Sequence, residues 1–214
     1  MQLEARDVLL VLGIRGTGKS QWTAREVVAA APRVMVWDPH AEYPTTTRRN
    51  LDHILDAIGA DGCSPLLESA ELSLSVVPTW RTRAELAEQF DLFVSLVESV
   101  GGCVVVVEEA GLLQGNGRET LEYLATQSRH WQTPVVLVAQ RATQISKTAR
   151  EQATAIVSFR QNDPSDVDAL VERCGAAAER VRSLPQFESF AWDESQAFDD
   201  SPTTGAQKEV QDVC

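Results

Sequence analysis

The 214-residue chain is long enough for one sizeable domain, and its 43% hydrophobic and 23% charged residues are typical of a folded globular protein. The formal net charge of −12 argues against the generic DNA-coating proteins, which are basic, but leaves room for a local DNA contact. No apolar run is long enough to cross a bilayer, and the acid-containing N-terminus does not resemble a secretory signal, so we expect a cytoplasmic protein.

Apolar runs bounded by turn residues predict strands, and apolar residues at helical spacing predict helices. In chain order, the expected strands span residues 7–13, 33–37, 71–77, 103–107, 134–140, 154–160 and 188–192. The expected helices span residues 19–31, 48–58, 82–100, 118–131 and 164–174, with a loop at 59–70. Strands that alternate with helices in this way predict an α/β fold with a mainly parallel central sheet flanked by helices.

The domain organisation is expected to be simple. Residues 1–194 form one domain, and residues 195–214 form an acidic tail with little apolar content that we expect not to order. The four cysteines and three histidines are scattered, which argues against a zinc site. Because open parallel sheets bind ligands beyond the carboxyl ends of their strands, the residues just after each strand are the candidates for function.

The first strand is followed by GIRGTGKS (13–20), which matches the phosphate-binding pattern G-x-x-x-x-G-K-[ST] without deviation. The glycines let backbone N–H groups surround phosphate oxygens at the start of a helix. Lys19 can reach the β- and γ-phosphates of ATP, and the Ser20 hydroxyl can ligate Mg²⁺. The residues expected to bind the nucleotide are Gly13, Arg15, Gly16, Thr17, Gly18, Lys19, Ser20 and Gln21.

The stretch CVVVVEEAG (103–111) places two adjacent carboxylates at the end of a buried strand. Neighbouring like charges are unfavourable unless a cation lies beside them, and a magnesium ion would make the pair tolerable. Glu108 then holds the metal, directly or through water, and Glu109 acts as the general base for the attacking water. The alternative is that both are solvated acids in the first turn of the next helix.

Two further strands end in polar residues. Gln140 follows the strand at 134–140 in LVAQR, where it could contact the γ-phosphate or the attacking water, although a polar residue at a strand end is unremarkable by itself. Asp38, His40 and Glu42 follow the strand at 33–37 in DPHAEY. Two carboxylates and one histidine on a loop are weak evidence for a metal site.

Five segments in this order resemble the FtsK–HerA family of ring-forming ATPases: GIRGTGKS, WDPHAEY, VVVVEEAG, SRHWQTPVVLVAQR and TAIVSFRQNDPSDVDAL. Within the family, the chain is most similar to the genome-packaging ATPases of tailless icosahedral viruses with an internal membrane. The resemblance covers residues 7 to about 173. Its most specific part is the combination of DPHAEY with AQR and FRQNDPSD, because the first motif is shared by all P-loop proteins.

The resemblance implies a RecA-like (ASCE) P-loop NTPase fold, in which the valine-run strand does not directly follow the P-loop helix. It implies Lys19 and Glu109 as catalytic residues, Gln140 as a sensor of hydrolysis, and Arg129 as an arginine finger for the neighbouring subunit's ATP. Arg129 could instead be a cation at a helix C-terminus. The family usually has Asp where this chain has Glu108, which leaves the manner of its metal contact open. Arg160 could lie at a subunit interface or form a salt bridge to Asp163 or Asp166.

In function, the resemblance implies a motor that uses ATP and Mg²⁺ to translocate double-stranded DNA, packaging a viral genome into a preformed capsid. A homo-oligomeric ring on DNA or at a capsid vertex, capsid or membrane vertex proteins as partners, and a location in the host cytoplasm or at the virion's packaging vertex follow from it. The loop 112–119 is our candidate for a channel loop, with Arg118 on DNA phosphate. The alternatives are a P-loop small-molecule or nucleotide kinase, a plasmid or chromosomal DNA pump, and a non-hydrolytic regulator.

Overall fold

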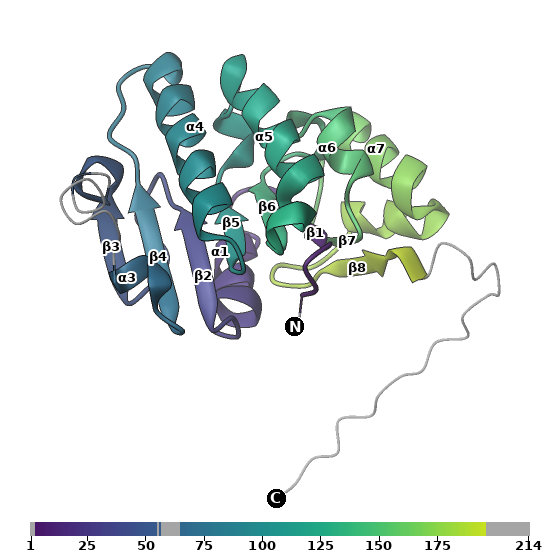
Figure 1. Cartoon of the computed structure of the whole chain (residues 1–214). Helices are drawn as coiled ribbons and strands as arrows, with labels where there is room; N and C mark the ends of the chain where they lie inside the picture. Colours follow the sequence, from purple (N-terminus) through teal and green to yellow (C-terminus); the bar gives the residue numbers. More distant parts are fainter. Residues whose placement is uncertain (1–2, 55, 57–64, 196–214) are drawn as a thin grey trace, which may run out of the picture.

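The computed structural model describes residues 3–54, 56 and 65–195, which form an eight-stranded sheet (Figure 1). The strands are β1 (Val8–Leu12), β2 (Arg33–Trp37), β3 (Thr47–Asn50), β4 (Leu72–Val77), β5 (Val104–Val107), β6 (Val135–Ala139), β7 (Ala155–Ser158) and β8 (Phe190–Asp193). Their order across the sheet is β3-β4-β2-β5-β6-β1-β7-β8. All neighbours are parallel except β7 and β8, so the predicted mainly parallel sheet is confirmed.

Strand β6 lies between the strand that precedes the phosphate loop and the valine-run strand. Leu10 of β1 pairs with Leu137 of β6, and Val106 of β5 pairs with Val136 on the other side of β6. This inserted strand is the arrangement that the RecA-like P-loop fold requires, and it confirms the fold predicted from the resemblance. The carboxyl ends of β1, β5 and β6 therefore lie side by side at one edge of the sheet.

Helices cover both faces of the sheet. They are α1 (Lys19–Thr23), which continues as a π-helical turn (Ala24–Val28), α3 (Pro65–Glu68), α4 (Arg83–Val100), α5 (Asn116–Gln127), α6 (Lys147–Glu151) and α7 (Pro164–Cys174). Helices α4 to α7 lie on one face, and α1 lies on the other (Figure 1). Alternate residues of β1 serve the two layers, since Leu10 packs on the α4–α7 side and Leu9 on the α1 side.

Short 3₁₀ turns join these elements at Ala110–Leu112, Ser128–Trp131, Ala142–Gln144 and Ala176–Arg182. The longest helix, α4, starts where the sequence predicts because Thr82 and Glu85 form a capping box. Its Phe90 and Phe93 rings pack against Trp37 of β2, with ring centroids 5.2 and 5.4 Å apart. These aromatic contacts fix α4 over β2.

Three predictions about local structure were wrong or incomplete. Residues 48–50 belong to the edge strand β3 rather than to a helix, although residues 51–54 are helical. Residues 65–68 of the predicted loop form α3. Residues 116–119 are the first turn of α5, so the candidate channel loop is shorter than expected. Residues 1–2, 55, 57–64 and 196–214, including nearly all of the predicted acidic tail, lie outside the described residues.

The described residues contain no helix that is both long enough and apolar enough to span a membrane.

Candidate active site

The phosphate loop connects β1 to α1, and two of its glycines are needed for its shape. A Cβ atom on Gly13 would lie 2.6 Å from the Cβ of Phe159, so only glycine allows this close approach. Gly18 has a φ of 99°, in the left-handed region that favours glycine. Thr17 donates its hydroxyl hydrogen to the carbonyl of Ile14 at 2.7 Å, which closes the loop from inside.

Lys19 lies inside this loop. Its Nζ donates to the carbonyl of Ile14 at 3.2 Å, and its side chain is largely buried. Burial lowers the pKa of Lys19, while the nearby carboxylates of Glu108 and Glu109 oppose that shift. An ammonium held in a loop of backbone N–H groups is suited to bind phosphate oxygens.

Glu108, at the end of β5, faces Ser20 and Tyr43. The Ser20 hydroxyl donates to Oε1 of Glu108 at 3.1 Å, and the buried Tyr43 hydroxyl donates to Oε2. Burial raises the pKa of Glu108, and both hydrogen bonds oppose this shift. Burial, followed by the adjacent Glu108 charge, raises the pKa of Tyr43 well above its usual value. A hydroxyl and a carboxylate oxygen this close together form a donor set that suits Mg²⁺, whose charge would favour the ionised carboxylate.

Asp38 explains the DPHAEY motif. Its buried carboxylate accepts hydrogen bonds from the backbone N–H of Glu42 at 2.9 Å and of Tyr43 at 3.0 Å, and from the Ser75 hydroxyl at 3.3 Å. These bonds fold the loop after β2 so that Tyr43 reaches Glu108. Among the described residues, no group of three or more His, Cys, Asp or Glu side chains is arranged to hold a metal ion, and the Asp38 carboxylate is instead occupied by these three donors.

Replacing Asp38 by alanine is expected to lower the free energy of unfolding by about 3 kcal/mol, because it leaves buried donors without an acceptor. The urea midpoint measures this loss. The matched control is Asp168→Ala, whose side chain is exposed on α7, and it should change the free energy of unfolding by less than about 0.5 kcal/mol. Equal stability of the two variants would contradict the role of Asp38.

Glu109 and Gln140 meet beyond the tips of β5 and β6. Nε2 of Gln140 donates to Oε1 of Glu109 at 3.0 Å. Glu109 has a φ of 51°, a left-handed conformation that is unfavourable for a residue with a side chain. It precedes the Ala110–Leu112 turn but makes no side-chain capping hydrogen bond there. Its geometry therefore gives no support to the alternative that it is a helix cap.

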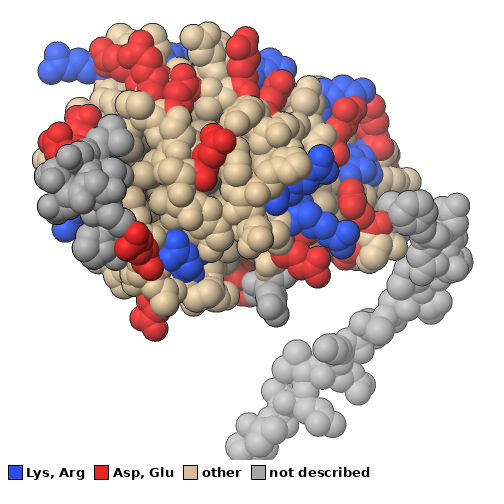
Figure 2. All heavy atoms as spheres, viewed as in Figure 1, with Lys and Arg blue, Asp and Glu red and all other residues tan. Residues whose placement is uncertain are grey.

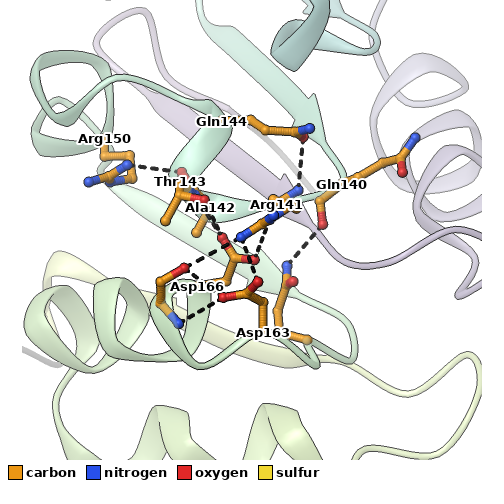
Figure 3. Close-up of polar contacts among 10 residues, drawn as sticks. Gln140, Arg141, Ala142, Thr143, Gln144, Arg150, Asp163 and Asp166 are labelled. Carbon is orange, nitrogen blue, oxygen red and sulfur yellow. Dashed lines mark hydrogen bonds and ion pairs between the residues drawn. The ribbon is translucent and has the colours of Figure 1, made fainter.

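Arg141, the next residue after Gln140, turns to the opposite side (Figure 3). It forms ion pairs of 2.8 Å with Asp163 and with the buried Asp166 at the start of α7. The Gln140 carbonyl accepts a hydrogen bond of 3.3 Å from Gln161. The segment that leads into α7 thus holds the end of β6 through Arg141 and the Gln140 carbonyl. The Gln140 side chain takes no part in these contacts and points to Glu109. The salt bridge that the sequence suggested for Arg160 is made by Arg141.

A cavity of about 660 Å³ lies above the phosphate loop. Its wall includes Lys19, Ser20, Glu108, Glu109 and Gln140, and also Arg15, Gly16, Gly18 and Gln21 of the predicted nucleotide-binding set. Gly13 and Thr17 support the loop from beneath and do not line the cavity. Phe187, which also lines the cavity, and Tyr43, which orients Glu108, were not predicted from the sequence.

Arg129 is not part of this cavity. It lies exposed in the Ser128–Trp131 turn that precedes β6. Arg129 is therefore at the amino ends of the parallel strands, whereas the phosphate loop is at their carboxyl ends. Within one chain it cannot act on a nucleotide bound at Lys19. Its predicted role as a finger thus depends on a neighbouring subunit, while its place after α5 also fits a helix C-terminal cation.

Solved structures share this fold. The genome packaging NTPase B204 of Sulfolobus turreted icosahedral virus 2, in complex with AMP, is 18% identical with a TM-score of 0.64, covering 91% of this chain and 95% of that one. B204, the DNA-packaging ATPase of Sulfolobus turreted icosahedral virus, is 15% identical with a TM-score of 0.63, covering 89% and 94%. VirB4 of Thermoanaerobacter pseudethanolicus is 11% identical with a TM-score of 0.56, covering 83% and 84%.

These proteins belong to the FtsK–HerA group of P-loop ATPases, so the resemblance drawn from the motifs is confirmed at the level of the fold. No protein-family model matches the chain, and a search of curated proteins gives no significant match.

Proposed function

We propose that this protein is an ATP-hydrolysing motor that translocates double-stranded DNA and packages a viral genome into a preformed capsid. One observation carries the proposal. A single cavity unites the phosphate loop around Lys19, the hydroxyl–carboxylate pair of Ser20 and Glu108, and the hydrogen-bonded pair of Glu109 and Gln140. The cavity therefore contains residues suited to bind phosphate, to coordinate a metal ion and to activate water.

The residues divide the chemistry of ATP hydrolysis between them. Lys19 and the backbone N–H groups of its loop bind the β- and γ-phosphates, and Ser20 and Glu108 hold Mg²⁺. Mg²⁺, when bound, neutralises charge on the transferring phosphoryl group. Glu109 accepts a proton from the attacking water, and Gln140 orients the Glu109 carboxylate through the hydrogen bond between them.

The same pair favours hydrolysis over transfer to an acceptor. A kinase excludes water and covers the phosphates with an arginine-rich lid, whereas Arg15 is the single arginine on the described wall of this cavity. A carboxylate held beside the γ-phosphate position suits activation of water. We therefore place the kinase alternative second.

The charge distribution constrains how DNA could be bound. On the face that Figure 2 shows, Lys and Arg side chains form small groups beside Asp and Glu rather than one continuous basic field. With a net charge of −12, a broad single-chain DNA surface is not supported. A ring in which each subunit contributes a few contacts to a central channel needs no such surface. Arg118, our candidate for such a contact, forms an ion pair of 3.4 Å with Glu122 on α5.

The test is ATP turnover with and without double-stranded DNA at low salt, together with light scattering to follow assembly. We expect DNA to raise turnover several-fold and to promote oligomers, and we expect Lys19→Ala to abolish both basal and stimulated turnover. An ATP turnover rate that does not change with DNA, in a chain that stays monomeric, would contradict the proposal that the protein is a DNA motor. Phosphate transfer to an acceptor would favour the kinase. Plasmid and chromosomal pumps share the DNA response, so binding to empty capsids distinguishes packaging from those alternatives.

A further inference from the structure

A segment from the C-terminal part of the fold lies across the phosphate loop. Gln186 donates from Nε2 to the carbonyl of Gly16 at 3.0 Å. The ring of Phe187 lies so close to Gly18 that a Cβ there would be 2.8 Å from Cδ1 of the ring. This contact joins parts of the chain about 170 residues apart, and it sets an aromatic ring at the mouth of the cavity.

Neither packing nor backbone preference accounts for Phe187. Its side chain is 62% exposed, so the folded protein gains little from burying it. Its φ of 68° is in the left-handed region, which is a genuine outlier for a bulky residue. Strained residues of this kind concentrate at ligand sites, where the surrounding structure holds them in place. The exposure of this ring, its strained backbone and its place beside the cavity therefore indicate a contact with a bound ligand.

We propose that Phe187 is the platform on which the nucleobase of the bound nucleotide stacks, an inference that rests on the proposed binding of ATP in this cavity. The residues around Lys19 and Glu108 are polar and suit the triphosphate and its metal. Phe187 is the single Phe, Tyr or Trp side chain on the described wall, which also includes the smaller, polar ring of His40. Every base presents a π-face to such a ring. Because stacking recognises the face of the base rather than its edge, ATP and GTP are expected to bind with similar affinity.

The experiment is calorimetric titration of the full chain with two probes in the presence of Mg²⁺: ATP and inorganic tripolyphosphate. Phe187→Ala is expected to weaken ATP binding about tenfold and to leave tripolyphosphate binding unchanged, because only ATP carries a base. Phe187→Trp retains a ring and should retain ATP affinity. The control is Leu92→Ala, which removes another exposed apolar side chain, 46% exposed on α4, and should affect neither probe.

Phe187→Gly separates binding from folding. Glycine tolerates the left-handed conformation, and this relief offsets its greater freedom in the unfolded chain, so the variant should keep a urea midpoint close to that of the unaltered chain and still lose ATP affinity. Unchanged ATP affinity in Phe187→Ala would overturn the inference, and so would an equal loss of ATP and tripolyphosphate, because that pattern means a distorted phosphate loop. Absence of ATP binding in the unaltered chain would instead overturn the proposed function itself.

Discussion

Replacing Glu109 by glutamine is expected to lower the rate of ATP hydrolysis about 10³-fold and to change ATP affinity less than about threefold. A glutamine has the same shape and can still accept the hydrogen bond that Gln140 now donates to Oε1 of Glu109. What it loses is the carboxylate that accepts the proton of the attacking water. The phosphate loop and the Ser20–Glu108 pair, which bind the nucleotide, stay intact.

Single-turnover kinetics and ATP titration measure the two quantities separately. The control is Glu88→Gln, which removes a carboxylate from the exposed face of α4 and should leave both unchanged. Because the substitution keeps the side-chain length and the left-handed backbone at position 109, the urea midpoint should not move. Full turnover in Glu109→Gln would show that Glu109 is not the general base and would contradict its assignment as a catalytic residue.

The elements that the sequence predicted well are those in which local chemistry and the global fold agree. The phosphate loop follows a wholly buried strand and starts a helix, and Glu109 and Gln140 follow apolar strands whose parallel pairing brings their ends together. A parallel sheet places these residues at the carboxyl ends of its strands, and the RecA-like strand order that the resemblance implies makes those strands neighbours. The fold and most of the cavity wall could be predicted for that reason.

The missed residues depend on contacts that no local pattern encodes. Tyr43 reaches Glu108 only because the Asp38 carboxylate folds the intervening loop. Phe187 lies against Gly18 through a connection that returns from the far end of the chain. The edge strand β3 was predicted as helix because its residues TRRN are polar and pair on one side only, with β4.

An arginine-finger role for Arg129 requires that it act on ATP bound to a neighbouring subunit. The phosphate loop lies at the carboxyl ends of the strands and Arg129 at their amino ends, so Arg129 cannot reach the cavity of its own chain. In a ring of identical chains, Arg129 of one subunit can face the cavity of the next. An arginine that stabilises charge on the phosphoryl group from a neighbouring subunit contributes about 10³-fold or more to the rate. Arg129→Ala is therefore expected to lower DNA-stimulated turnover by about that factor, with ATP affinity unchanged.

Mixing two inactive variants tests whether Arg129 acts on a neighbour. Lys19→Ala chains keep Arg129 but bind no phosphate, and Arg129→Ala chains keep the cavity but lack the finger. In a random equal mixture, roughly a quarter of the subunit interfaces join an intact cavity to an intact arginine, so turnover should return to about that fraction of the unaltered protein. The control Arg6→Ala removes an exposed arginine just before β1, at the same edge of the sheet, and should retain full turnover. Unchanged turnover in Arg129→Ala would leave it as a helix C-terminal cation, while an inactive mixture of assembled rings would exclude action in trans.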